Sequence, residues 1–373
     1  MVPEDSTFAI RAIPHAHNPA MEIDLGPSHP GSAGMLTGTL SHRDGRITAI
    51  DPSPGALHRG AELIFPARDY RQALSLANRH DWQAPFFGEW AIARLVEDAL
   101  GIEVPARAVA IRVALAEHAR ISSHLAYLSF LGFRWGRGDL ATDEVRAALR
   151  ARLAEWTGNR VHPMAVRLGG VAADIDPPTV ESLLATLREA TALAGRLRAH
   201  LAASDLGRGV AVVTPAVVDA YGLAGPVARA SGVRTDLRLA DPGYAGVRDA
   251  LATDGAMEGD AWSRFDHLLA EIPASALIIG RVLDGLSAGP LRAHLPKAIR
   301  LPEGDFVSAV EAPLGRAGVV VTSRGATTPW RLRLRTASAA NVAAWPAVLT
   351  GATLEDLPLA LASLPWVAGD LDK

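Results

Sequence analysis

The sequence contains no cysteine among its 373 residues. This absence excludes disulfide bonds, thiolate nucleophiles, zinc sites built on cysteine, and iron–sulfur clusters ligated by thiolates of this chain. Lysine is scarce as well, because only Lys297 and Lys373 occur and arginine carries nearly all the positive charge. With 37 basic against 40 acidic residues, the formal net charge is -3, so no global field attracts nucleic acid or an anionic membrane.

The sequence also lacks a long apolar run. One uncharged stretch, residues 336–354, contains Asn341, Pro346 and Gly351, which makes it a poor membrane-spanning helix. The N-terminal residues have neither the basic region nor the apolar region of a signal peptide. No HExxH, P-loop, GxSxG or strand-linked GxGxxG motif occurs. We therefore expect a soluble or peripheral protein of a reducing, cytoplasmic compartment.

The spacing of apolar residues predicts a mostly α-helical fold with small β-sheets, of the α+β class. Residues 1–19 form a loose leader, and residues 20–59 predict a small N-terminal sheet with a hairpin at Asp44–Gly45. Residues 60–300 predict a helical core, and residues 301–373 predict a small C-terminal sheet and a tail. We expect residues 20–373 to form a single domain, since no linker or repeat divides them.

Three helices of the predicted core are clear from the sequence. One spans 107–131, where apolar residues recur at a period of 3.6. A second begins after Asp176–Pro177–Pro178, a helix-capping residue followed by first-turn prolines. A third covers 260–286, where Pro273 should kink or split it.

A few polar residues could carry chemistry. His29 lies in a Gly/Pro-rich loop at 26–34, which could line a site or be a plain turn. Residues 79–82 bring together a cation, an imidazole, a carboxylate and an indole, and a surface charge pair is the alternative. His162 precedes Pro163 in an ordered loop or a simple turn. On the polar side of the 107–131 helix we expect three further residues, for which a structural role is more common: His118, Arg120 and His124.

Several blocks of sequence carry a family resemblance. They are GPSHPGSAGMLTGTL from Gly26, PGALHRGAE (54–62), DYRQALSLANRHDW (69–82), the stretch 95–125, GNRVHPMAVRLGGV (158–171), the stretch 208–238 and the tail VAGDLDK. In order and without large gaps, these blocks resemble the D-type subunit of respiratory NADH–quinone oxidoreductase (complex I). That family is related to the large subunits of nickel–iron hydrogenases. The resemblance implies their fold, a helical core flanked by small β-structures.

The resemblance also assigns roles to individual residues. In the family, a quinone headgroup lies between a His and a Tyr, and the corresponding positions here are Ala33 and Trp82. A carboxylate that partners the family's His corresponds to Arg134. Arg79 and His162 match positions that face the terminal iron–sulfur cluster of a neighbouring subunit. The nickel-ligating cysteines of the hydrogenases are absent, so no metal site is expected.

The family implies a subunit of an ion-translocating complex I-type assembly that transfers electrons from NADH to quinone. The chain would line the acceptor cavity, hold no cofactor through its own ligands, and be inactive alone. The implied partners are an iron–sulfur subunit of the hydrogenase small-subunit type, membrane-arm subunits and other peripheral-arm subunits, with no nucleic acid. These partners would hold the chain peripherally on the cytoplasmic side of the membrane. Two alternatives remain, a nickel-free subunit of a hydrogenase-related energy-converting complex and a non-catalytic scaffold.

The altered positions lead to one structural hypothesis. We expect Ala33, Trp82 and Arg134 to converge near His29 and Asp81 in one cavity that reaches toward the partner's cluster. An indole N–H donates a hydrogen bond but delivers no proton near neutral pH. Catalytic roles would then fall to His29, Asp81 and Trp82, with His80 as a further candidate proton donor.

Overall fold

The computed structural model describes residues 5–10, 21–23, 36–252 and 254–373. Its strands are β1 (Asp5–Ile10), β2 (Met21–Ile23), β3 (Leu36–Arg43), β4 (Arg46–Ser53), β5 (Val166–Arg167), β6 (Gly170–Val171), β7 (Glu303–Ala312), β8 (Gly315–Arg324) and β9 (Arg331–Arg335). Its α-helices are α1 (Ala61–Ile64), α2 (Tyr70–Ala77), α3 (Phe86–Leu100), α4 (Ala106–Arg134), α5 (Asp143–Thr157), α6 (Pro177–Ala202), α7 (Pro215–Tyr221), α8 (Gly225–Ala230), α9 (Ala261–Asp284), α10 (Ala337–Ala343), α11 (Trp345–Leu349), α12 (Leu357–Ser363) and α13 (Ala368–Leu371). Two short 3-10 helices, η4 (Leu237–Leu239) and η5 (Pro242–Leu251), precede α9.

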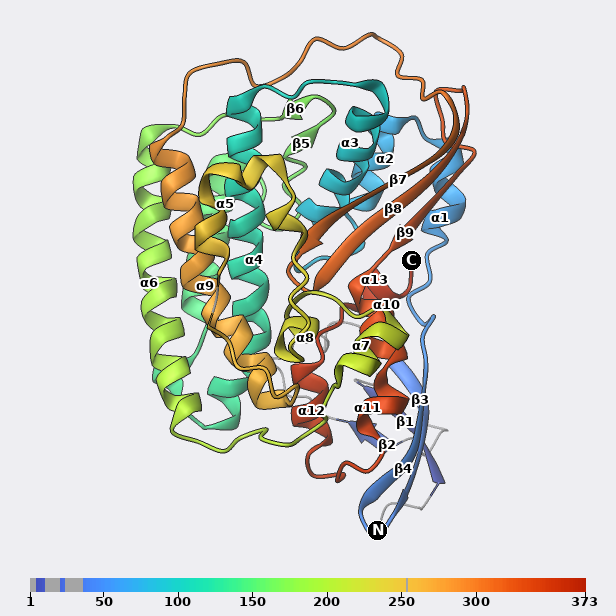
Figure 1. The fold of residues 1–373 in the computed structure, drawn as a ribbon, viewed down its shortest axis with the longest axis vertical. Helices are drawn as coiled ribbons and strands as arrows, with labels where there is room; N and C mark the ends of the chain where they lie inside the picture. The colour runs from blue at the N-terminus through green and yellow to red at the C-terminus, as the bar shows by residue number, and fades with distance from the viewer. Residues whose placement is uncertain (1–4, 11–20, 24–35, 253) are drawn as a thin grey trace.

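The long helices α4, α5, α6 and α9 form a bundle, and α1, α2 and α3 lie beside the sheet β7–β8–β9 (Figure 1). At the other end of the molecule, the N-terminal sheet lies beside the short helices of the C-terminal region. The N-terminal sheet has the order β2–β1–β3–β4. None of the helices in the described part of the chain combines the length and apolar character needed to cross a membrane.

The predicted elements are confirmed in most places. The β3–β4 hairpin turns at Asp44 and Gly45, which both have positive φ (51° and 74°), as a two-residue hairpin turn requires. Helix α6 begins at Asp176, whose side chain accepts a hydrogen bond from the Thr179 backbone N–H at 2.8 Å. The three strands expected after residue 301 form an antiparallel meander.

Three expectations need correction. Residues 5–10, placed in the loose leader, form β1, because a β-branched and aromatic stretch pairs with the edge of β3. Helix α9 continues through Pro273 without splitting, since it packs against both α4 and α6, which offsets a cost of roughly 3 kcal/mol. Helix α4 has no polar, solvent-facing side at the three residues expected there, because α5, α9 and β7 surround it: His118, Arg120 and His124 are all buried.

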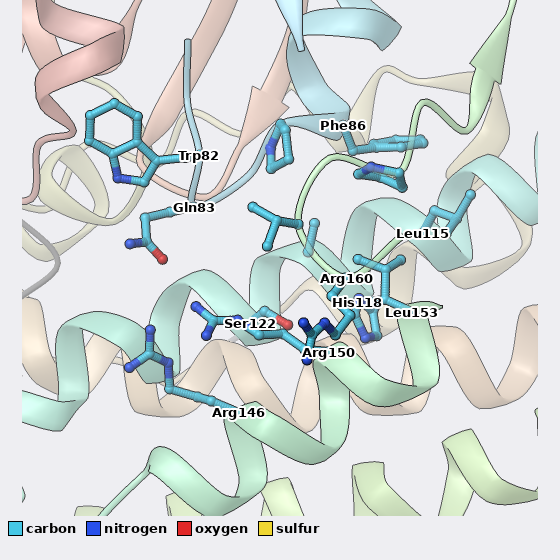
Figure 2. Close-up of a pocket in the computed structure, with 14 residues that line it drawn as sticks. Trp82, Gln83, Phe86, Leu115, His118, Ser122, Arg146, Arg150, Leu153 and Arg160 are labelled. Atoms are coloured by element: carbon cyan, nitrogen blue, oxygen red, sulfur yellow. The ribbon is translucent and has the colours of Figure 1, made fainter. Parts of the chain in front are cut away.

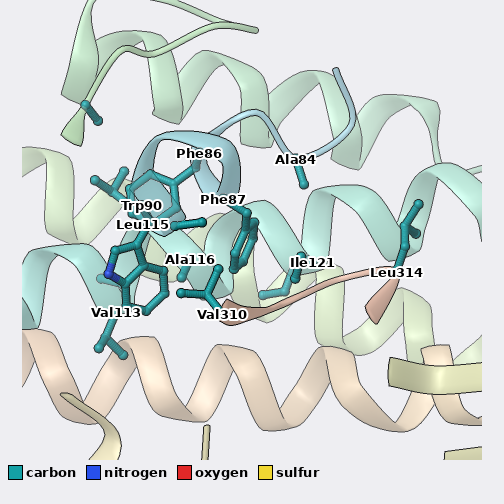
Figure 3. Close-up of a cluster of buried hydrophobic side chains, with 14 of the residues drawn as sticks. Ala84, Phe86, Phe87, Trp90, Val113, Leu115, Ala116, Ile121, Val310 and Leu314 are labelled. Carbon is teal, nitrogen blue, oxygen red and sulfur yellow. The ribbon is translucent and has the colours of Figure 1, made fainter. Parts of the chain in front are cut away.

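Two hydrophobic clusters hold the fold together. The larger one joins the helical bundle to the sheet β7–β8–β9, and the smaller one joins the N-terminal sheet to the C-terminal helices. Figure 3 shows Phe86, Phe87 and Trp90 of α3 packed between α4 and Val310 of β7. Trp82 packs against both clusters, so the short connection between α2 and α3 lies where the two clusters meet.

The seating of α3 on the end of α2 leaves no room for a side chain at Gly88. A Cβ atom there would overlap the Ala77 carbonyl oxygen. We expect Gly88→Ala to lower the free energy of unfolding by about 1–3 kcal/mol, the usual cost of overpacking. Chemical denaturation of the full chain measures this. Gly195→Ala on α6 is the control, since its Cβ would meet nothing within 4 Å and should stabilise by about 0.5–1 kcal/mol. Equal stability of the two variants would contradict this account of the α2–α3 contact.

Candidate functional site

The RHDW motif lies in the turn between α2 and α3. A capping box on Asp69 fixes the start of α2: its carboxylate accepts from the Gln72 N–H at 2.8 Å, and the Gln72 side chain accepts from the Asp69 N–H. Helix α2 ends at the buried residue Asn78, so the following residues leave the helix at a defined place. The turn continues to Pro85, where α3 begins.

Asn78 joins Arg79 to His162, which lies far away in the sequence. The Asn78 side-chain oxygen accepts a hydrogen bond from the Arg79 guanidinium at 2.7 Å. Its backbone oxygen accepts from Nδ1 of His162 at 3.0 Å. Burial and the nearby Arg79 charge lower the pKa of His162 below its ordinary value. The ring is therefore neutral at pH 7, and with Nδ1 as donor it offers Nε2 as an acceptor.

Glu89, on α3, holds Asn78 in place. Its buried carboxylate accepts hydrogen bonds from the Asn78 side-chain amide and, at 2.8 Å, from the Val166 backbone N–H. Burial raises the pKa of Glu89 to about 7, because the hydrogen bonds and the nearby arginines offset the desolvation only in part. Glu89 thus fixes the Asn78 amide, which in turn positions Arg79.

Arg59 ties the turn to the C-terminal segment. Its guanidinium donates to the Arg79 backbone oxygen at 3.0 Å and to the Gly369 backbone oxygen at 3.1 Å. It also lies 3.3 Å from Nδ1 of His80. Burial, followed by the Arg59 charge, lowers the pKa of His80 to about 4, so this ring is neutral near pH 7. His80 is a candidate proton donor from the sequence. Because its ring is neutral, it carries no imidazolium proton to donate at neutral pH.

Trp82 lies directly on Gly369. A Cβ atom on Gly369 would overlap Cζ3 of the indole and lie 2.6 Å from the His80 backbone oxygen, so only glycine fits there. The indole Nε1 is buried and has no hydrogen-bond partner in the part of the chain that the structure describes. Buried donors of this kind usually have a hydrogen-bond partner.

Trp82 borders a small cavity of ≈ 50 Å³, which we call the Trp82 cavity. Its walls combine the apolar residues Phe86, Leu115 and Leu153 with the buried side chain of His118. Figure 2 shows Trp82 and Gln83 on one side of the cavity, and a polar group on the other side that comprises Ser122, Arg146, Arg150 and Arg160. Burial and the charge of Arg150 lower the pKa of Arg146, and the Ser122 hydroxyl has no hydrogen-bond partner among the described residues.

Arg134 lies elsewhere. It is the exposed last residue of α4 and lines a different cavity, with Phe130, Phe133 and Asp205. The Trp82 cavity meets α4 at Ser122, twelve residues earlier, and twelve helical residues span roughly 18 Å. The expected convergence of Trp82 with Arg134 is therefore not seen among the described residues. His29 and Ala33 lie outside the described residues.

Comparison with known proteins places this arrangement in a family. Residues 140–300 and 294–373 match the family model described as respiratory-chain NADH dehydrogenase, 49 Kd subunit. A protein of Salinispora tropica, named as a D-type subunit of NADH-quinone oxidoreductase, is 38% identical over 364 residues, covering 95% of this chain and 93% of the relative. The chain belongs to this family, the D-type subunits of complex I. With the observed helical bundle and small sheets, membership confirms the predicted hydrogenase large-subunit-like α+β fold.

Further relatives carry the same name. A Streptomyces griseus protein, also named as a D-type subunit of NADH-quinone oxidoreductase, is 37% identical, and the match covers 96% of this chain and 94% of the relative. The D-type subunit of NADH-quinone oxidoreductase from Carboxydothermus hydrogenoformans is 32% identical, and the match covers 94% of this chain and 98% of the relative. Nearly the full length of these relatives is thus represented in the chain.

Sequence reasoning missed four residues that build the site: Arg59, Asn78, Glu89 and Gly369. Three of them lie inside blocks that carry the family resemblance, namely PGALHRGAE, DYRQALSLANRHDW and VAGDLDK. Those blocks were a usable signal, but their individual roles depend on contacts between distant segments. Glu89 had no such signal, because a carboxylate three residues into a helix usually favours the helix dipole at the surface.

The raised pKa of Glu89 makes the stability of the chain depend on pH. The folded protein binds more protons than the unfolded chain between about pH 4 and pH 7, so the free energy of unfolding falls as the pH rises through that range. A Glu89→Gln variant carries no such charge, and its stability relative to the unmodified chain should rise by up to roughly 3 kcal/mol between pH 4 and pH 8. Denaturant unfolding at both pH values measures this difference.

Glu181→Gln, on the exposed side of α6, is the matched control and should change stability by less than about 0.5 kcal/mol at either pH. A Glu89→Gln difference that stays constant with pH would show that folding does not raise the pKa of Glu89.

Proposed function

We propose that this chain lines the electron-acceptor cavity of a complex I-type, ion-translocating assembly, next to an iron–sulfur cluster held by a partner subunit. The observation that carries the proposal is the Asn78 junction, which holds Arg79 and His162 together beside the Trp82 cavity. These are the two residues that the family resemblance assigns to the cluster-facing surface. They come from separate segments, so their meeting is a property of the fold.

The chemistry of the two side chains suits that position. Arg79 is solvent-exposed and His162 is half-buried, so both are accessible to a partner. A cluster gains negative charge when it is reduced, and a nearby guanidinium favours the reduced form. The chain has no cysteine to ligate a cluster, so the ligands belong to the partner subunit. In this arrangement Arg79 and His162 tune a cluster that the chain does not hold.

We propose that the acceptor bound at the Trp82 cavity is a ring with carbonyl oxygens, such as a quinone. Its walls are largely apolar and aromatic, and two buried donors, Nε1 of Trp82 and the Ser122 hydroxyl, lack partners among the described residues. A quinone supplies two acceptor oxygens and takes up two electrons and two protons when it is reduced. The indole would orient one carbonyl oxygen without supplying a proton.

The family places the chain in the peripheral arm of the assembly, and we propose that its attachment to the membrane runs through other subunits. We further propose an iron–sulfur subunit, membrane-arm subunits and other peripheral-arm subunits as its partners, on the cytoplasmic side of the membrane. NADH would be the electron source and the coupling ion would be moved by the membrane arm.

The electrostatic role of Arg79 can be tested on the purified assembly. Arg79→Ala removes a positive charge next to the proposed cluster, so the midpoint potential of the nearest cluster should become more negative. Potentiometric titration followed by electron paramagnetic resonance measures the shift, and His162→Ala should change the same signal.

Arg188→Ala, on the exposed side of α6, is the control and should leave every cluster potential unchanged. Cluster potentials that are the same in Arg79→Ala and in the control would contradict the cluster-facing position. The unmodified chain must also co-purify with an iron–sulfur subunit, and its absence from the assembly would overturn the proposed function.

The hydrogen bond from Trp82 can be tested with a conservative change. Trp82→Phe keeps an aromatic ring on Gly369 but removes the indole N–H, and a lost hydrogen bond to a bound headgroup typically costs about 0.5–1.5 kcal/mol. The KM for a short-chain quinone should therefore rise several-fold in the assembly, while NADH oxidation by an artificial acceptor stays unchanged. An unaltered KM would point to a scaffold role for this cavity.

A further inference from the structure

Two carboxylates, Asp81 and Asp370, line one further cavity, which we call the carboxylate cavity. Its volume is ≈ 40 Å³, and its walls come from α3, from the β7–β8 turn and from the start of α10. Both residues are the acidic members of segments already described, since Asp81 precedes Trp82 and Asp370 follows Gly369. Neither forms an ion pair with an arginine, lysine or histidine within the described ranges.

Backbone and hydroxyl groups hold each carboxylate in place. Oδ1 of Asp81 accepts hydrogen bonds from the N–H groups of Gln83 and Ala84, both at 3.0 Å. Asp370 is buried, and Ser338 of α10 binds its side chain. These bonds fix the positions of the two groups but involve no full positive charge.

Two buried carboxylates at close range cannot both be ionised cheaply. Burial, and then the charge of Asp370, raise the pKa of Asp81 to about 7. Burial likewise raises the pKa of Asp370. Both carboxyl groups therefore hold a proton to a higher pH than a free aspartate side chain does.

Six other charged or titratable groups face the pair from the elements that pack against it. They are Arg59, His80, Tyr127, Arg316, Arg335 and Lys373. His80 is neutral at pH 7 for the reasons given above, and the pKa of Tyr127 is raised well above its ordinary value. The charge of Lys373 lowers the pKa of Asp370. The Arg335 guanidinium donates hydrogen bonds to the backbone oxygens of Arg316 and Gly222. The pair remains the group best suited to exchange a proton near neutral pH.

The pair lines a different cavity from Trp82, but the chain segments that carry the two carboxylates are in contact at Trp82 and Gly369. The Trp82 indole packs on Gly369. The Arg59 guanidinium donates hydrogen bonds to the backbone oxygens of Gly369 and Arg79, and so joins the segment of Asp370 to the turn that carries Asp81. Both chain segments that carry the carboxylates therefore meet at Trp82. Asp81 precedes Trp82 in the chain and Asp370 follows Gly369, so each carboxylate belongs to a segment that contacts the other at the indole.

We propose that Asp81 and Asp370 share one exchangeable proton and pass it to an oxygen of the acceptor bound beside Trp82. This inference rests on the proposed function. The carboxyl O–H bond breaks and an O–H bond forms on the acceptor oxygen, which gains its electron from the partner subunit's one-electron donor. A new proton enters the pair from water in the carboxylate cavity as the first proton leaves, so the pair keeps one proton between its two carboxyl groups. This assigns to a carboxylate pair the proton supply that Trp82 cannot provide.

The shared proton is tested first on the full chain alone, without acceptor or partners. Infrared or carbon-13 magnetic resonance titration of aspartate-labelled protein should show one carboxyl group that ionises in the neutral range. Either Asp81→Asn or Asp370→Asn should move that ionisation to acid by at least tenfold in proton concentration, because the remaining carboxylate loses its like-charged neighbour. Asparagine keeps an oxygen to accept the existing hydrogen bonds, so both variants should fold.

Asp219→Asn, exposed on α7 and remote from both cavities, is the control and should leave the neutral ionisation in place. A neutral ionisation that persists unchanged in both pair variants, or its absence from the unmodified chain, would overturn the shared proton. Circular dichroism and the unfolding midpoint confirm that each variant is folded before it is titrated.

The transfer is tested in the assembly with a short-chain quinone. Asp81→Asn and Asp370→Asn should each lower kcat most on the alkaline side of the pH profile, while KM for the quinone changes little. An unchanged pH profile in both variants would overturn the transfer step. Failure of the unmodified assembly to reduce any quinone would instead count against the proposed function, and the titration of the full chain would still decide whether the proton is shared.

Discussion

The position of α4 depends on one buried carboxylate, Glu117. Its oxygens accept hydrogen bonds from Arg120 at 3.1 Å, Arg238 at 3.2 Å, Tyr244 at 2.7 Å and Ser275 at 2.5 Å. Burial alone would raise the pKa of Glu117, but the two guanidinium groups and the two hydroxyls lower it to about 2. Removing a partner of such a buried charge typically costs about 3–5 kcal/mol, so the four donors fix α4 against η4, η5 and α9. A helix that is buried on nearly all sides can hold its register only if its charges are matched in this way.

This constraint reaches the functional turn through α3. Arg120 lies 5.7 Å from the ring centre of Phe87 and donates to the Glu311 backbone oxygen of β7 at 2.6 Å. Arg120, which pairs with Glu117, therefore also contacts α3 and β7 and holds them against α4. Because the turn that carries Arg79 and Trp82 leads directly into α3, the ion network of the bundle sets the place of the site. A second network, in which Glu271 accepts from His124 and Arg229, ties α9 and α8 to the same side of α4.

The sequence predicts the elements well and the contacts poorly, for a physical reason. Helical periodicity, capping residues and the Asp44–Gly45 turn are local properties, and they located α4, α6 and the β3–β4 hairpin. The roles of Asn78 and Glu89 arise only when α2, α3 and the segment around His162 are packed together, and no spacing rule encodes that. Family resemblance named the positions of Trp82 and Arg134, but a rigid helix of 29 residues decides how far apart they lie. Family resemblance also could not show that His118, Arg120 and His124 are buried, because their burial depends on the elements packed around α4.

The electrostatics around Trp82 suit a reaction in which electrons and protons arrive by different routes. The Trp82 cavity carries arginines and the neutral imidazole of His162 is held nearby, whereas the carboxylate cavity carries the acidic pair. An electron entering near Arg79 adds negative charge, which the guanidinium groups stabilise. The same negative charge on an acceptor strengthens its affinity for a proton. Asp81, which precedes Trp82 in the chain and whose pKa is raised to about 7, is the proposed source of that proton. In the proposed reaction Trp82 orients the acceptor through its N–H, and its ring, packed on Gly369, contacts the segment that carries Asp370. In the proposed reaction the indole delivers no proton near neutral pH, so the acceptor takes its proton from a group other than Trp82.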